Sequence, residues 1–242
     1  KGAVAASASA ASSTRPLARL YCAAAFVLGA TLCLSFPLKL PIGAFYWDVA
    51  VYSDAFHRIG LGQAPALDFF APVGPLGYYA GFLLDRLFPI AHPLFIANWA
   101  LLPVVLPLAL VVIWQRGARD HALGLLLPFL VLVALPINLS IFYPGPGLDG
   151  FGAYNRHAAA LLYWLIATLI FVQSARGRTV LVAVFMLALF LTKITGAAVG
   201  AILVGYACLA GRLRVMEPDG STSLVRVAYA GTNDQPYGSI GR

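Results

Sequence analysis

The stretch FYWDVAVYSDAFHRIGLGQAPALDFFAPVGPLGYYAG, residues 45–81, interrupts a chain that otherwise consists mainly of long apolar runs. It holds three of the nine acidic residues of the protein, Asp48, Asp54 and Asp68. The apolar runs on either side approach the length of about 20 residues that a membrane-spanning helix needs. We therefore interpret this stretch as a loop between membrane helices and expect it to carry the chemistry.

The composition of the whole chain points to a membrane. Of the 242 residues, 61% are apolar and only 10% are charged, and the mean hydropathy is +0.85. Soluble domains average about 25% charged residues, so this chain has too little polar surface for a water-soluble globule. We predict an all-α integral membrane protein, a bundle of six or seven transmembrane helices with a large outer loop that carries short surface helices.

The excess of positive charge has a topological explanation. The formal net charge of +7 comes mainly from Lys and Arg in short loops, as the positive-inside rule predicts for a membrane protein. We therefore expect the lipid bilayer as a partner and no nucleic acid.

Cys22, Cys33 and Cys208 lie in apolar stretches without a CxxC pattern, which indicates buried free thiols rather than a metal site.

Three regions follow from these patterns. They are a disordered N-terminal lead (residues 1–16), a transmembrane helical domain (17–211) and a polar C-terminal tail (212–242). The first span covers about residues 17–38 and has a basic flank, which places the N-terminus in the cytoplasm of a bacterial, multi-pass inner-membrane protein. A cleaved signal peptide is the alternative. The tail is a disordered segment, a small hairpin or the start of a further region.

Two polar loops are expected on the outer face, the first over residues 38–72 and the second over 144–157. The basic loops QRGARD (115–120) and RGR (176–178) are separated by two spans, so they fall on the same, inner side. This places the second outer loop on the same face as Asp48. Residues 73–114 form either one crossing with a surface or re-entrant helix, or two short crossings.

A lone lysine marks the last apolar region. Residues 179–211 contain one charged residue, Lys193, with Gly196 and Gly200 after it. We predict a tight hairpin of two short helices with Lys193 near the outer turn. One tilted helix with Lys193 buried is the alternative.

Helical spacing separates the acids of the first outer loop. Residues 47–59 read as a short helix near the membrane surface, in which Asp54 has Arg58 at i+4 as an ion-pair partner. Asp48 has Tyr52 at i+4 and no basic residue within four positions, so it becomes the candidate catalytic acid. Asp68 is either a turn residue or a second acid that binds a metal ion or the acceptor.

A carboxylate at the outer surface suits a transferase that uses a lipid-linked sugar. Such a donor keeps its polyprenyl tail in the bilayer and its phosphate at the interface. Asp48 could deprotonate the acceptor as a general base, and the departing phosphate needs cations. Arg156 and Lys193 are the candidates, because both fall on the outer face; an interface anchor is the alternative for Arg156.

The segment WDVAVYSDAFHRIGLGQAPALDFFAPVGPLGYY (47–79) resembles the first outer loop of bacterial glycosyltransferases of the C-type superfold, GT-C. That superfold places a catalytic Asp shortly after its first helix, often in a D-x-x-x-Y spacing that Asp48 and Tyr52 match. The segments AYNRHAAALL and LTKITG, around Arg156 and Lys193, are similar to later segments of bacterial members. Further matching positions are Gly62, Asp68, Phe69, Phe70, Gly74, Pro75, Leu76, Tyr154 and Asn155.

The resemblance implies a polyprenyl-phosphate sugar as donor, Asp48 as general base, Tyr52 and Asp68 on the acceptor side, and Arg156 and Lys193 on the donor phosphate. Members usually have more spans than this chain, so it could be a truncated or degenerate member, or a partner membrane protein could supply further helices. No cofactor is required by the sequence. A divalent metal ion shared by Asp48 and Asp68 remains possible, although the four histidines show no metal-binding spacing.

A second interpretation belongs to another class: a non-catalytic membrane subunit that packs within a larger complex. Small residues such as Gly196 and Gly200, four positions apart, would serve helix packing in it. A transporter is less favoured, because the chain has no inverted repeat and few charges inside its spans.

Overall fold

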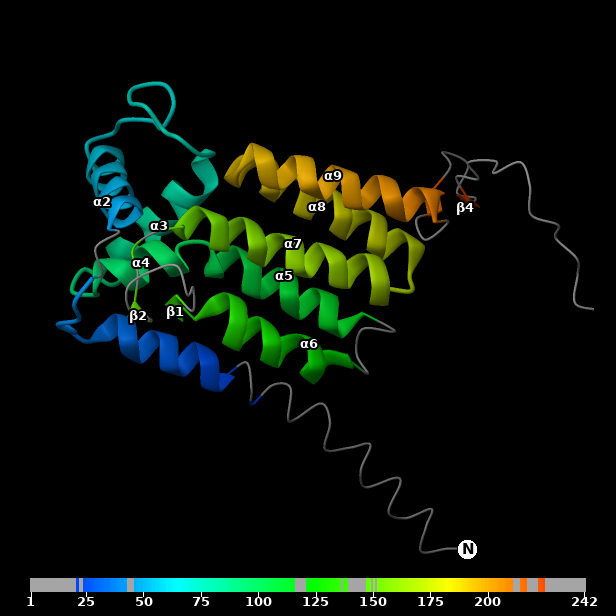
Figure 1. Ribbon diagram of the computed structural model, residues 1–242, viewed down its shortest axis with the longest axis horizontal. Coiled ribbons are helices and arrows are strands. Elements are labelled where there is room, and N and C mark those ends of the chain that lie inside the picture. The colour runs from blue at the N-terminus through cyan, green and yellow to red at the C-terminus, as the bar shows by residue number, and fades with distance from the viewer. Residues whose placement is uncertain are drawn as a thin grey trace, which may run out of the picture.

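The computed structural model describes residues 21, 24–42, 46–115, 121–135, 137–138, 147–148, 150, 152–210, 214–216 and 222–224. This part of the chain is predominantly helical, as predicted. Figure 1 shows two regions, a group of short helices at one end, which we call the cap, and a bundle of longer helices that extends away from it. The predicted lead (1–16) and most of the predicted tail (212–242) lie outside the described residues.

The cap consists of α2 (Trp47–Gly60), α3 (Pro75–Leu87) and α4 (Pro93–Trp99). The bundle consists of α5 (Leu102–Trp114), α6 (Ala122–Pro128) with its π-helical continuation η2 (Phe129–Ala134), α7 (Ala153–Phe171), α8 (Ala175–Thr192) and α9 (Ile194–Leu209). A further helix, Ala24–Ser35, lies along the lower edge of Figure 1 in blue. Two short antiparallel pairs complete the described elements: β1 (Ile137–Asn138) with β2 (Gly147–Leu148), and β3 (Arg214–Met216) with β4 (Thr222–Leu224).

The prediction of six or seven transmembrane helices is wrong. Among the described residues, only α8 is by itself long and apolar enough to cross a membrane, and α4 with α5, bent by 41°, forms a second candidate. The other apolar helices, Ala24–Ser35, Ala122–Val131 and α9, have only 10–17 residues, fewer than the roughly 20 that a bilayer requires. The apolar runs were counted as continuous, but the structure breaks them into shorter helices and buries many of their side chains against one another.

Within residues 73–114, α3 belongs to the cap and only the bent pair of α4 and α5 reaches the length of a span. By length and composition, this pair makes at most one crossing, and the number of crossings in 73–114 stays a prediction. The short length of α4 has a local cause. Pro93 is its first residue, and Leu101 to Pro103 follow shortly after its end, where Pro103 has no backbone N–H to continue the helix.

The short helix predicted over 47–59 is confirmed as α2, and its predicted ion pair forms, with Arg58 Nε 2.8 Å from Asp54 Oδ2. The helix ends before Gly62, whose φ of 85° lies in the left-handed region that glycine tolerates. Pro75 is the first residue of α3, as expected for a residue that lacks a backbone N–H.

Two apolar cores lie on either side of the beginning of α7. The bundle core gathers around Trp164 of α7, with Phe129 and Phe185 fully buried beside it. The cap core gathers around Tyr52 and Tyr78 and includes Ala153, the first residue of α7. The start of α7 is therefore the point where the cap meets the bundle.

The predicted hairpin is confirmed, because α8 and α9 pack against each other and Lys193 lies at the turn between them. Close packing depends on two glycines of α9. A Cβ atom on Gly196 would lie 3.1 Å from Cβ of Ala158, and one on Gly200 would lie 2.8 Å from Sδ of Met186. These small residues serve packing inside the chain.

The far end of the bundle carries the turns expected to be basic. A Cβ atom on Gly177 would lie 3.2 Å from Oε1 of Gln115, so the C-terminal end of α5 and the start of α8 are neighbours there. Residues 116–120 lie outside the described residues. Asp48, the start of α7 and Lys193 lie at the opposite end, beside the cap (Figure 1).

Candidate functional site

The Asp48 carboxylate fastens the cap to the bundle. Asp48 lies in the first turn of α2 and is only 6% exposed. Its Oδ2 accepts hydrogen bonds from the backbone N–H of Gly152 at 2.6 Å and of Ala153 at 2.9 Å. These are among the first N–H groups of α7, which have no partner within the helix and favour a negative charge. The sequence showed no local partner for Asp48; the tertiary structure supplies backbone donors.

Gly152 makes this contact possible. It is the N-cap residue of α7 and has φ of 81°, in the left-handed region. A residue with a side chain is strained in that conformation. Glycine at this position therefore turns two successive N–H groups toward one carboxylate oxygen.

A chain of buried polar groups lies beside Asp48. The hydroxyl of Tyr52 and Nδ1 of His157 are 3.0 Å apart, and Nε2 of His157 lies 3.2 Å from the carbonyl oxygen of Asn98. Because a carbonyl can only accept, Nε2 carries the proton and Nδ1 accepts from the tyrosine hydroxyl. Gly77 leaves room for this bond, since a Cβ atom there would lie 2.9 Å from the Tyr52 hydroxyl.

Burial changes the pKa values of these groups so that their neutral forms are favoured. Desolvation lowers the pKa of His157 to about 4, although hydrogen bonds to the backbone of Asn98 and Ala97 oppose the shift. Burial, and then the negative charge of Asp48, raises the pKa of Tyr78 to about 12. The Tyr52–His157 pair is therefore neutral around pH 7.

Tyr78 adds a further polar group to this region. Its side chain is fully buried, and its hydroxyl has no hydrogen-bond partner among the described residues; the same holds for Oδ1 of Asn98 and Oγ1 of Thr192. Buried polar atoms are rarely left in this state. These three atoms are candidates to bind a polar ligand group.

Lys193 lies at the turn of the α8–α9 hairpin, at the same end of α7. Its Nζ donates a hydrogen bond to Oδ1 of Asn155 and lies 4.6 Å from the centre of the Tyr154 ring. Burial, and then the charge of Asp48, raises the pKa of Tyr154. The Tyr154 ring therefore helps to hold the Lys193 ammonium group at this end of α7.

The backbone near Lys193 is tied to the cap. The N–H of Gly74 donates a 2.9 Å hydrogen bond to the carbonyl oxygen of Thr192. A Cβ atom on Gly74 would lie only 2.2 Å from the carbonyl oxygen of Leu191. Glycine at position 74 therefore allows the loop before α3 to lie directly against the turn that carries Lys193.

The structure gathers Asp48, Tyr52 and Lys193 around the start of α7, and it places the other two predicted residues elsewhere. Arg156 Nη1 donates to the carbonyl oxygen of Leu135, at the end of η2. Asp68 lies in an exposed turn, where its Oδ2 accepts a 2.7 Å hydrogen bond from the N–H of Ala64. The contact of Asp68 corresponds to its interpretation as a turn residue.

Sequence reasoning missed His157, Tyr78 and Asn98. The bond between Tyr52 and His157 joins positions 105 apart, so no local spacing could reveal it. A metal site gains no support within the described residues, which contain no group of three His, Cys, Asp or Glu side chains suited to bind an ion.

Comparison of the chain with family models, with curated proteins and with solved structures found no match.

Proposed function

We propose that this chain is a membrane glycosyltransferase that takes a sugar from a polyprenyl-phosphate donor where α2, α7 and the α8–α9 turn meet. One observation carries the proposal. An acid from α2 and a cation from the α8–α9 turn both bind the first residues of α7, Asp48 at Gly152 and Ala153 and Lys193 at Asn155, at the end of an apolar helical bundle. A lipid-linked donor needs this arrangement, because its charged head must react while its tail stays in lipid.

Lys193 is the proposed ligand of the donor phosphate. Its ammonium group has three donors, and the described contact with Asn155 uses one of them. Asn155 and the Tyr154 ring hold the ammonium group at the partly exposed turn. Lys193 is favoured over Arg156, whose guanidinium group bonds to the backbone of Leu135.

Asp48 is the proposed general base. Two backbone N–H groups fix its carboxylate and favour the charged form. In the proposed reaction the carboxylate takes the proton of an acceptor hydroxyl as the acceptor oxygen bonds to the anomeric carbon. The bond from that carbon to the phosphate oxygen breaks, and polyprenyl phosphate leaves with the bonding electron pair.

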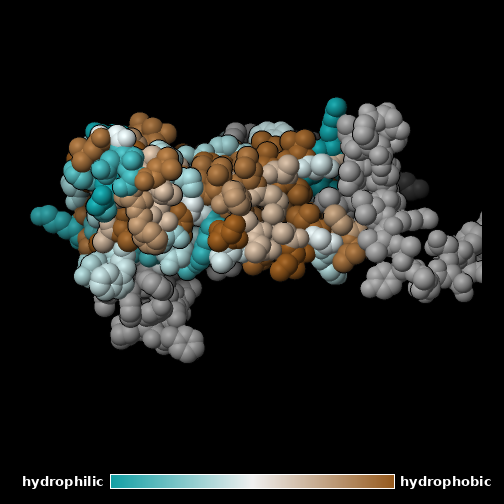
Figure 2. All heavy atoms as spheres, turned by 90° about the horizontal axis from the view of Figure 1, so that it is seen from above, coloured by the Kyte–Doolittle hydropathy of each residue, from teal (hydrophilic) through white to brown (hydrophobic). Residues whose placement is uncertain are grey.

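The outer faces of α8 and α9 support a location in the inner membrane. Large apolar side chains stand exposed along both helices, including Leu187, Phe190, Ile202 and Tyr206. Figure 2 shows apolar residues over much of the visible face of the bundle. Exposed apolar surface of this extent is typical of lipid or protein contact, and a bilayer here would receive the donor's tail.

The alternative function, a non-catalytic membrane subunit, was supported by two glycines expected to pack against a partner, and the structure removes this support. Gly196 and Gly200, which were expected to pack against a partner, contact Ala158 and Met186 of the same chain.

The test is sugar transfer in proteoliposomes, with a panel of labelled undecaprenyl-phosphate sugars and an extract of cell-envelope lipids and glycans as acceptor. Asp48→Asn keeps an oxygen that can accept from Gly152 and Ala153 but removes the negative charge. We expect it to lower kcat by a factor of about 10²–10⁴, and its melting curve checks that the variant is folded at the assay temperature. Wild-type turnover in Asp48→Asn would exclude Asp48 as the base.

A second pair of variants tests the donor site. Lys193→Gln should raise the KM for the donor or lower turnover by about tenfold or more, as for loss of a hydrogen bond to a charged group. Lys39→Gln is the matched control, because Lys39 is exposed on the segment before α2, and it should behave as wild type. Absence of transfer from every donor, or equal behaviour of the two lysine variants, would contradict the proposal.

A further inference from the structure

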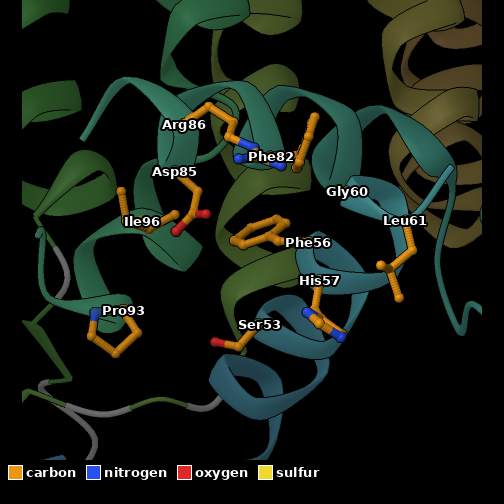
Figure 3. A pocket seen from close by; sticks show the side chains of 10 residues that line it. All are labelled: Ser53, Phe56, His57, Gly60, Leu61, Phe82, Asp85, Arg86, Pro93 and Ile96. Atoms are coloured by element: carbon orange, nitrogen blue, oxygen red, sulfur yellow. The ribbon is translucent and has the colours of Figure 1, made fainter. Parts of the chain in front are cut away.

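A second pocket opens in the cap, on the side of α2 away from Asp48. Its volume is about 360 Å³, within the range of small-molecule sites, roughly 300–1,000 Å³. Figure 3 shows side chains from α2, α3 and α4 around it. The lining residues are Ser53, Phe56, His57, Gly60, Leu61, Phe82, Asp85, Arg86, Pro93 and Ile96.

This pocket is separate from the site around Asp48. On α2, Tyr52 faces the buried core beside Asp48, whereas Ser53 and His57 face the pocket. The ring of Phe56 lies between the two sites, 5.8 Å from the ring of Tyr52. Binding of a ligand in this pocket therefore does not depend on the proposed transfer reaction.

Asp85 is the central polar group of the pocket. Its half-buried side chain reaches between Ile96 and Phe56 in Figure 3. Among the described residues Asp85 has no ion-pair partner within 4.0 Å. Burial raises the pKa of Asp85, and the charge of Arg86 partly opposes this shift.

Arg86 forms another part of the wall. Its guanidinium carbon lies 5.2 Å from the centre of the Phe82 ring, and a Cβ atom on Gly60 would lie 3.1 Å from its Nη2. Stacking on an aromatic ring leaves the edge of a guanidinium group able to donate hydrogen bonds. Gly60 allows α2 to end close to this group.

The chemistry of the lining selects a class of ligand. Asp85 and Arg86 carry opposite charges, so the pocket favours neither a net anion nor a net cation. A carboxylate that accepts, a guanidinium group that donates, and the Ser53 hydroxyl and His57 imidazole that can do both match a ligand with several hydroxyl groups. The Phe56 and Phe82 rings offer apolar surface to the C–H face of such a ligand.

From these contacts we propose that the pocket between α2, α3 and α4 binds a neutral saccharide, with Asp85 accepting from sugar hydroxyls and Arg86 donating to them. A zwitterionic headgroup would present both charges, but it lacks the apolar ring face that the two phenylalanines fit.

The experiment measures binding to the full chain in lipid nanodiscs by saturation-transfer NMR and calorimetry. Alkyl-glycoside detergents are avoided, since their headgroups would compete. The probes are the methyl glycosides of D-glucose, D-galactose, D-mannose and D-arabinose, with glycerophosphoethanolamine as the zwitterionic comparison. We expect at least one glycoside to bind and glycerophosphoethanolamine not to compete with it.

Two variants locate the binding. Asp85→Asn should weaken glycoside binding by about tenfold or more, as for a hydrogen bond to a charged group. Gly60→Leu should abolish it by filling the space near Arg86. Gly205→Leu is the matched control, because no atom lies within 4 Å of a Cβ built there, and it should bind as wild type.

The outcomes distinguish this proposal from the transferase. Binding of no glycoside to the wild-type chain, preferential binding of glycerophosphoethanolamine, or unchanged binding in both Asp85→Asn and Gly60→Leu would overturn the saccharide site. Asp48→Asn should bind the glycosides normally even where transfer is lost, so a failure of one proposal leaves the other testable. Melting temperatures confirm that each variant is folded.

Discussion

The hydroxyl of Tyr52 donates a hydrogen bond of 3.0 Å to Nδ1 of His157, which joins α2 to α7 across 105 positions of sequence. Both side chains are buried. The bond links the cap to the bundle. A second link lies nearby, where the Asp48 carboxylate accepts hydrogen bonds from the first N–H groups of α7. The orientation of α2 over the site therefore depends on two polar contacts to the first residues of α7, at Gly152 and Ala153 and at His157.

Tyr52→Phe should destabilise the protein by about 1–3 kcal/mol, because it leaves the acceptor nitrogen of His157 buried without a donor. The measurement is the free energy of unfolding in mixed micelles, with Tyr206→Phe as the matched control. Tyr206 is 71% exposed, so its variant should lie within about 0.5 kcal/mol of wild type. Equal stabilities of the two variants would show that the Tyr52–His157 bond contributes nothing.

The protein should lose stability as the pH falls from about 6.5 toward 4. The pKa of His157 is about 4 in the folded chain against 6.5 for the free side chain, so the unfolded state binds a proton first. The contribution of the neutral imidazole is complete above the unfolded pKa and is lost as pH approaches the folded pKa. It amounts to about 3 kcal/mol.

The measurement for this prediction is the unfolding free energy of wild type and of His157→Gln at several pH values. Carboxylates also titrate at the acidic end, so the difference between the two proteins isolates the histidine. That difference should change by up to about 3 kcal/mol between pH 7 and pH 4. A difference that is constant with pH would contradict the buried, neutral histidine.

Gly74→Ala should separate the loop before α3 from the α8–α9 turn. The new Cβ atom would lie 2.2 Å from the carbonyl oxygen of Leu191, and the backbone must move to relieve the contact. We expect a loss of about 1–3 kcal/mol, as for other overpacked sites. Gly205→Ala, in open space, serves as control and should be neutral or slightly stabilising. A Gly74→Ala protein as stable as this control would mean that the approach of the two segments is not tight.

Cysteine labelling tests the proposed location in the inner membrane and the proposed orientation there. In a chain whose own cysteines are replaced by Ser, Leu67→Cys, in the exposed turn of the cap, should react with an impermeant maleimide added to intact spheroplasts. Arg176→Cys, exposed at the far end of the bundle, should react only after permeabilisation. The reverse pattern would place the cap on the cytoplasmic side, and equal labelling of both would argue against a membrane-spanning bundle.

Local sequence patterns predicted the local structure well. The i, i+4 spacing of Asp54 and Arg58 predicted their ion pair, and Lys193 predicted the turn of the last hairpin. Each depends on a few neighbouring residues whose geometry a helix fixes. Hydropathy predicted too many membrane spans, because an apolar residue has the same hydropathy whether it faces lipid or packs inside the chain.

The sequence by itself determined that the chain is helical and apolar, that α2 follows the first apolar helix, and that Asp48 has no basic neighbour in its own helix. Only the tertiary structure decided what surrounds that acid. It placed the Asp48 carboxylate on the N–H groups of Gly152 and Ala153, brought Lys193 to Asn155 and the Tyr154 ring, and turned Arg156 toward Leu135. Helical periodicity orders residues within one element, whereas contacts between positions about a hundred residues apart follow from how the elements pack.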